Sequence, residues 1–275
     1  MTSTDGKTLQ EKVFKKGSRT YFTSSLFFPE EMRRDVLILY GFVRVADNFV
    51  DATPQDAAGF EGFGANYRQA LAGQPSGDPI IDDYVELARR KRFDPAWTDA
   101  FLDAMRADLS RHSYDTVDQV LGYMYGSAEV IGLFMARIMD LPEETLPYAR
   151  LLGRAMQYIN FIRDIDEDFH LGRRYLALAP TALPSLDPEY AHAHPDEYRR
   201  FIDYHLGLYN GWQKEAEKGF AMIPRRYRIP IRTASDMYRW TANRIQGDPS
   251  IVFKRKVKPG KSRIILRALG NVLAG

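Results

Sequence analysis

The stretch MQYINFIRDIDEDF, residues 156–169, gathers four acidic side chains within five residues at the end of a mostly apolar segment. Successive residues of an ideal helix advance by about 100°. The polar side chains that then share one stripe, about 80° wide, are Gln157, Asn160, Asp164 and Asp168. Charges held against an apolar helix are costly unless they are paired. The stretch therefore predicts a partner for these acids elsewhere in the fold.

A matching pattern occurs near residue 40, in LYGFVRVADNFVD (39–51). The polar side chains of this helix that share a stripe about 60° wide are Tyr40, Arg44, Asp47 and Asp51. Nearly all other residues from position 36 to position 50 are apolar, as expected for a helix that is buried on most sides. Two mostly apolar helices thus each carry one narrow polar stripe that ends in two aspartates spaced i, i+4.

Facing stripes would place at least four carboxylates and one asparagine around a single cavity. Unpaired carboxylates repel and raise each other's pKa, whereas Mg²⁺ binds oxygen ligands and commonly shares one or two carboxylates with the phosphates of a substrate. Arg44 would then contact the remaining phosphate oxygens. The pattern predicts a metal-assisted site for a substrate with a phosphate group and an apolar remainder. The alternative for any single pair is a solvated helix end, and Asp166 and Glu167 point away from the Asp164 stripe.

Composition supports a helical protein without a strong charge preference. The chain has 275 residues, a formal net charge of +2 and no cysteine, which excludes disulfides and thiolate metal sites. No N-terminal signal sequence and no run of about 18 apolar residues is present, so we expect a cytoplasmic protein. The small net charge argues against nucleic-acid binding. Strand signals are scarce, and we expect a single all-α domain over residues 1–275.

Start and stop signals predict where the helices lie. The segments with the strongest helical pattern are 30–51, 116–140, 145–169, 194–220 and 233–245. Weaker amphipathic patterns cover 55–72, 78–92 and 95–111. The Gly- and Pro-rich segments at 72–79 and 179–190 are predicted to be loops.

Five stretches, taken in order, resemble the squalene/phytoene synthase family, the head-to-head branch of the class I isoprenoid synthases. They are SRTYF (18–22), LYGFVRVADNFVD (39–51), YMYGSAEVIG (123–132), NFIRDIDEDFHLGRRYL (160–176) and MYRW…DPSIVFKRKV (237–257). The resemblance implies an all-α class I isoprenoid synthase bundle with a central cavity. It also implies Mg²⁺, which Mn²⁺ could replace, and two allylic isoprenoid diphosphates as substrates.

The resemblance also assigns roles to individual positions. The implied metal ligands are Asp47, Asp51, Asn160, Asp164 and Asp168. The implied diphosphate contacts are Ser18, Arg19, Thr20, Tyr40, Arg44, Tyr238 and Arg255. Positions expected near the reacting ends of the two substrates are Tyr123, Ala128, Gly132 and Gln157. Two residues depart from the family pattern. Asn48 replaces an acid that is not a ligand, and Glu129 stands where glycine is common, so that it would add a fifth carboxylate if it pointed inward.

The resemblance leaves the product open. Phytoene synthase is the primary hypothesis: two C20 geranylgeranyl diphosphates condense through prephytoene diphosphate to phytoene. The alternative is squalene or dehydrosqualene synthase, which condenses two C15 farnesyl diphosphates, with NADPH only for squalene. A more remote alternative is a non-catalytic assembly factor, against which the four motif aspartates argue. The basic segment KRKVKPGKSRIILRALG (254–270) has two interpretations, a solvated tail or a peripheral contact with an anionic membrane.

Overall fold

The computed structural model describes residues 28–273, and every element found there is helical apart from one isolated bridge between Ser113 and Arg174. The principal helices, in chain order, are α3 (Glu30–Asp51), α4 (Ala57–Leu71), α5 (Pro79–Arg90), α6 (Pro95–Ala107), α7 (Val117–Met124), α8 (Val130–Ile138), α9 (Leu146–Arg163), α10 (Ile165–His170), α11 (Pro188–Ala193), α12 (Pro195–Glu217), α13 (Arg225–Gly247), α14 (Ile251–Lys254) and α15 (Lys261–Leu273). The all-α expectation is confirmed for these residues. The single domain over 1–275 stays a prediction.

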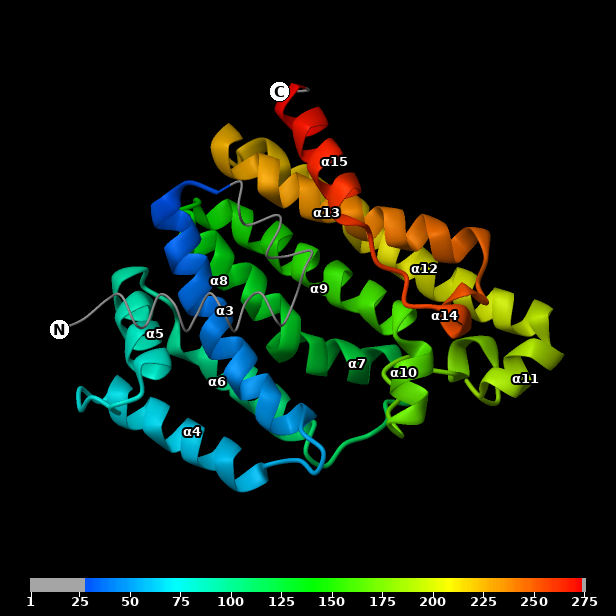
Figure 1. Cartoon of the computed structure of the whole chain (residues 1–275), viewed down its shortest axis with the longest axis horizontal. Helices are drawn as coiled ribbons and strands as arrows, with labels where there is room; N and C mark the ends of the chain where they lie inside the picture. The colour runs from blue at the N-terminus through cyan, green and yellow to red at the C-terminus, as the bar shows by residue number, and fades with distance from the viewer. Residues whose placement is uncertain (1–27, 274–275) are drawn as a thin grey trace.

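Helix α9 runs through the middle of the fold (Figure 1). It packs most extensively against α12 on one side and α8 on the other. One hydrophobic cluster joins α3, α4, α5, α6 and α8, and the other joins the second half of α9 to α12. Helices α8 and α12 therefore lie on either side of α9, and α4–α6 pack with α3 and α8 in the first cluster.

Helix α3 has the bounds predicted from sequence, Glu30–Asp51. Two acids lie in its first turn, where they complement the helix dipole, and Pro29 precedes it. Segment 116–140 is helical as expected, but its middle turn, η1 (Tyr125–Glu129), is a π-helix between α7 and α8. Such turns interrupt α-helices mostly at functional sites.

The predicted helix over 145–169 is divided in two. Asp164 has φ −99° and ψ 14°, and it ends α9 and precedes α10. Hydrogen bonds from Asp164 N to the Asn160 carbonyl (2.8 Å) and from Asp168 N to the Asp164 carbonyl (2.8 Å) bridge the break. The two aspartates thus keep their i, i+4 relation while the chain bends between them. Helix α13 begins eight residues earlier than predicted, and α15 forms where no helix was predicted.

Candidate active site

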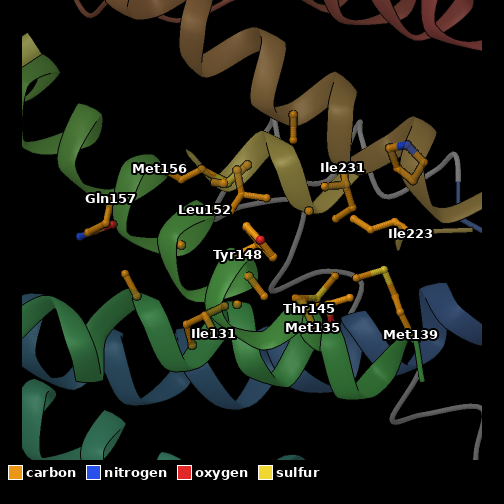
Figure 2. A pocket seen from close by; sticks show the side chains of 18 of the residues that line it. Ile131, Met135, Met139, Thr145, Tyr148, Leu152, Met156, Gln157, Ile223 and Ile231 are labelled. Atoms are coloured by element: carbon orange, nitrogen blue, oxygen red, sulfur yellow. The ribbon is translucent and has the colours of Figure 1, made fainter. Parts of the chain in front are cut away.

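A cavity of about 220 Å³ follows α9 between α3, η1, α8 and α13 (Figure 2). Thr145, just before α9, and Asn160, near its end, both line it, so the cavity extends about 22 Å at 1.5 Å per residue. Most of the wall is apolar. The residues around the end near Thr145 include Met135, Met139, Leu141, Ile223 and Ile231, and the polar end is formed by Tyr40, Gln157, Asn160 and Tyr238.

Two glycines let the walls of the cavity approach closely. A Cβ atom on Gly132 would lie 2.1 Å from the Ala149 carbonyl oxygen, and one on Gly153 would lie 2.4 Å from the Ala128 carbonyl oxygen. Only glycine therefore permits this contact between η1, α8 and α9. Ala128 and Gly132, which the sequence places near the reacting ends, both line the cavity.

At the polar end, three predicted side chains come together from three helices: Tyr40 from α3, Asn160 from α9 and Tyr238 from α13. The Oδ1 atom of Asn160 is buried and has no hydrogen-bond partner among the described residues. Burial raises the pKa of Tyr40 to about 12, although the charge of Arg44 opposes the shift. An unpaired amide oxygen at this end is the donor that a hard cation would use.

The first aspartate pair lies at the end of α3, beyond this polar end. Arg44 forms an ion pair with Asp47. Asp51 accepts a hydrogen bond from Arg173 Nη1 at 3.0 Å, and Arg173 Nη2 also donates to the Val50 carbonyl at 3.1 Å. Burial and the charge of Asp51 raise the pKa of Asp47 well above its usual range. The carboxylate of Asp51 is therefore close enough to oppose the ionisation of Asp47.

The second aspartate pair lies where α9 meets α10. Asp164 accepts a hydrogen bond from Arg163 Nε at 2.9 Å, and Lys256 Nζ lies 3.6 Å from its Oδ1. Lys256 also pairs with Glu167, so Glu167 shares a cation with the motif rather than only facing solvent. Burial and the neighbouring charge of Asp164 raise the pKa of Asp168 to about 7.

Arg173 connects the two pairs. It bonds Asp51 directly, and its positive charge favours the ionised forms of Asp168 and of Asp108. On the other side of Asp164, burial and the charges of Lys256 and Arg163 lower the pKa of Lys258. A cation whose charge is opposed by neighbouring cations marks a place where an anion would be stabilised.

Tyr123 has a different position from the one expected. It does not line the cavity. Its hydroxyl donates to Asp108 Oδ2 at 2.7 Å, and Tyr175 donates to Asp108 Oδ1 at 3.2 Å. Burial raises the pKa of Asp108 to about 6. Tyr123 thus holds a buried carboxylate whose charge acts on Asp47.

Glu129 is not a fifth carboxylate of the cavity. The neighbouring residues Ser127, Ala128 and Ile131 line the cavity, whereas Glu129 does not. Its side chain is buried and accepts hydrogen bonds from Arg150 and Arg154 of α9. It therefore ties the π-helical turn to the side of α9 that faces away from the cavity.

Some assignments could be placed only in part. Ser18, Arg19 and Thr20 lie outside the described residues. Arg255 is exposed at the end of α14, and its neighbour Lys256 is the residue that contacts the second aspartate pair. Sequence reasoning missed Asp108, Arg163, Arg173 and Lys256. Arg163 and Arg173 had a signal, since both lie close to the acidic run 164–168 in the sequence. Lys256 lies in the basic segment 254–270, far from that run in the sequence. Asp108 had none, because its partners are distant in sequence.

The two aspartate pairs and Asn160 could supply some, but not all, of the ligands of a magnesium ion. Among residues 28–273, no three acidic, histidine or cysteine side chains converge closely enough to hold a metal alone. Mg²⁺ does not require such a set, because it commonly takes one or two carboxylates and completes its sphere with water and substrate phosphate. The aspartate pairs and the unpaired Asn160 oxygen supply donors of that kind.

Comparison with known proteins identifies the family of this chain. The model of the squalene/phytoene synthase family matches residues 14–263. The 15-cis-phytoene synthase of Pantoea ananas is 29% identical, with 94% of this chain and 89% of that protein covered. The corresponding enzyme of Paracoccus sp. is 27% identical over 93% of this chain and 88% of its own length.

Two solved structures share the fold. The squalene synthase HpnC of Alicyclobacillus acidocaldarius has a TM-score of 0.80 at 21% identity, with 88% of this chain and 94% of that chain covered. A dehydrosqualene synthase in complex with a ligand has a TM-score of 0.79 at 20% identity, with 98% and 96% covered. The chain belongs to the squalene/phytoene synthase family. It is a prenyltransferase of the head-to-head, phytoene-synthase-like type.

Proposed function

We propose that this protein is a phytoene synthase that condenses two geranylgeranyl diphosphates in the presence of Mg²⁺. The observation that carries the proposal is an apolar cavity with one polar end, where the charge of Asp47 acts on Tyr40 and that of Asp164 acts on Tyr238. Relatives that cover most of the chain are 15-cis-phytoene synthases. The likeness to squalene and dehydrosqualene synthase structures concerns the fold, so it does not favour the C15 alternative.

The bonds and protons of the proposed reaction balance. The C1–O bond of the first diphosphate breaks, and the electron pair leaves with the diphosphate. The double bond of the second substrate attacks the cation, and loss of a proton closes a cyclopropane. The resulting prephytoene diphosphate loses its own diphosphate, rearranges and loses a second proton to give phytoene. Two substrates thus give one hydrocarbon, two diphosphates and two protons, and no reductant is consumed.

The chain's own residues contribute charge, position and dryness. Asp47, Asp51, Asn160, Asp164 and Asp168 would hold magnesium, which supplies Lewis-acid stabilisation of the departing diphosphate. The cations now paired with these acids, such as Arg44 and Lys256, exchange carboxylate for diphosphate oxygens once the acids bind metal. This is the charge-assisted contact expected for phosphate. The apolar wall excludes water that would quench a carbocation.

A product assay tests the proposal. Purified protein with Mg²⁺ is incubated with the C20 or the C15 diphosphate, with and without NADPH, and the extracted hydrocarbon is identified. Phytoene from the C20 substrate without NADPH is expected. A C30 product from the C15 substrate would refute the proposed substrate, with the NADPH dependence separating squalene from dehydrosqualene. No product from folded protein would favour the assembly-factor alternative.

Substitution of one acid tests the site itself. Asp164→Asn should lower turnover about 10³-fold, because loss of one metal ligand forfeits several kcal/mol of charge stabilisation. Asp166→Asn is the matched control, since Asp166 lies two residues away and faces His170 at 3.5 Å instead of the motif cations. Equal loss in both variants would mean that local folding, rather than metal ligation, is affected.

A further inference from the structure

Helix α15 has an apolar face that no described residue covers. Of the nine large apolar side chains that are exposed among residues 28–273, five lie on this helix. They are Ile265, Leu266, Leu269, Val272 and Leu273, and their exposed fractions run from 40% to 87%. At 100° per residue they form one stripe about 120° wide. We call this stripe the α15 outer face.

The opposite side of α15 is already occupied. Ile264 and Ala268 are buried, and Asn271 donates to Thr233 Oγ1 at 3.1 Å on α13. Arg267 Nε donates to Asp236 at 2.7 Å, also on α13. The helix lies across α13 at the edge of the fold (Figure 1), fixed there by one face, and its exposed apolar side chains form a second face. Packing within the fold does not explain the second face.

Positive charge surrounds the α15 outer face. Residues 249–275 include seven lysines and arginines and no acid. Lys261 borders the stripe on one edge and Arg263 on the other, as their angular positions require. At the far end, Arg225 of α13 donates to the Val272 carbonyl at 2.9 Å, and Arg232 is exposed on the same helix. An apolar stripe between cationic edges is the pattern of helices that lie in the interface of an anionic membrane.

We propose that the α15 outer face docks this protein onto an anionic lipid bilayer, with α15 parallel to the surface. A second copy of the chain and the N-terminal residues 1–27 both match the positive charge around the α15 outer face poorly. In a two-fold dimer the same patch meets itself, which would oppose like cations with no acid on the patch. The N-terminal residues 1–27 have five lysines and arginines against two acids, so they do not complement the patch either. Among residues 28–273 no helix is long and apolar enough to span a bilayer, so the proposed contact is peripheral.

The docking would place the cavity close to lipid. Ile231, Ala234 and Tyr238 of α13 line the cavity, while Thr233 and Asp236 of the same helix contact α15. One helix layer, about 8–10 Å between axes, therefore separates the cavity wall from α15. The docking itself requires neither substrate nor turnover, so its test is independent of the proposed function.

Vesicle sedimentation tests the docking. The full chain is mixed with vesicles of phosphatidylcholine alone or of phosphatidylcholine with phosphatidylglycerol, and the bound fraction is measured. We expect binding only to the anionic vesicles, and weaker binding when salt rises from about 0.1 M to about 1 M. The double substitution Leu266→Ser with Leu269→Ser should reduce the partition coefficient at least about tenfold. Leu71→Ser, on an exposed apolar residue of α4, is the matched control and should leave it unchanged.

Thermal unfolding of each variant verifies that the fold is intact, as expected for exposed positions. No binding to either vesicle, or equal binding by wild type and the α15 double variant, would overturn the proposal. So would a dimer in gel filtration that the double variant dissociates without any vesicle binding, because the face would then be an interface between two copies.

Discussion

Replacing Glu129 by alanine should destabilise the protein without removing a ligand from the cavity. The Glu129 side chain is 1% exposed. Arg150 donates to its Oε2 atom from Nε at 3.0 Å and from Nη2 at 2.8 Å, and Arg154 Nε donates to Oε1 at 2.7 Å. The substitution therefore leaves two guanidinium groups without their shared carboxylate.

The loss in the free energy of unfolding depends on how well water can hydrate the guanidinium groups of Arg150 and Arg154 once Glu129 is removed. Removing one partner of a fully buried ion pair costs about 3–5 kcal/mol. Here Arg150 and Arg154 are 44% and 20% exposed, so water can reach them. Each also lies over an aromatic ring, Arg150 over Tyr125 at 5.2 Å and Arg154 over Trp212 at 5.3 Å, and retains that contact. We expect a loss of about 2–3 kcal/mol, which lowers Tm by about 5–10 °C in a protein of this size.

Thermal and urea unfolding measure this loss. Glu143→Ala is the control, since Glu143 is 66% exposed and pairs with Arg137 at 2.6 Å. Such a surface pair contributes about 1 kcal/mol or less. The Mg²⁺ dependence of turnover, measured well below Tm, should be the same in Glu129→Ala and wild type. An unchanged Tm together with an altered Mg²⁺ requirement would refute this account and restore Glu129 to the metal site.

Two further substitutions test the fold around the cavity. His205 is fully buried, and burial lowers its pKa from 6.5 to about 4. Because the unfolded chain binds the proton more tightly, this group should lower the free energy of unfolding by about 3 kcal/mol as the pH drops from 6.5 to 4. Urea unfolding of His205→Gln should lack this contribution. Gly153→Ala should cost about 1–3 kcal/mol or more, because its Cβ would lie 2.4 Å from the Ala128 carbonyl oxygen. Gly207→Ala is the control, because a Cβ at this position of α12 would have no atom within 4 Å. It should raise Tm slightly, since alanine favours the helix by about 0.5–1 kcal/mol. Equal shifts of Tm in both glycine variants would show that the close approach at Gly153 does not limit packing.

The sequence predicted correctly those helix ends that are marked by a nearby proline. Pro29 and Pro54 bracket α3, so its bounds could be read from the sequence. Tyr40 and Asn160, one from each polar stripe, line one end of the cavity, whereas the four stripe aspartates are not among the residues that line it. In contrast, the break at Asp164 has no proline or glycine to announce it. The π-helical turn η1 contains no proline, and its backbone approaches both α6, at Gly126, and α9, at Ala128.

Long-range partners were the part that sequence could not supply. Arg150 and Arg154 are spaced i, i+4, which shows that they share a face of α9 but not that Glu129 lies opposite. The family resemblance implied a position near the reacting ends for Tyr123. Its hydroxyl instead bonds Asp108, fifteen residues away. Helix α15 was not predicted, since its formation depends on packing against α13.

The distribution of side chains along α9 explains how one helix serves both halves of the site. Its cavity side carries Tyr148, Leu152 and Met156 at successive turns and becomes polar at Gln157 and Asn160. The opposite side of α9 carries Arg150 and Arg154, which hydrogen-bond Glu129. The same helix therefore lines the cavity and holds the π-helical turn η1 in place. The break at Asp164 ends α9 at the point where the apolar wall gives way to charged residues. Beyond it, Arg173 bonds Asp51 of α3 while its charge favours the ionised form of Asp168, so one cation acts on both aspartate pairs.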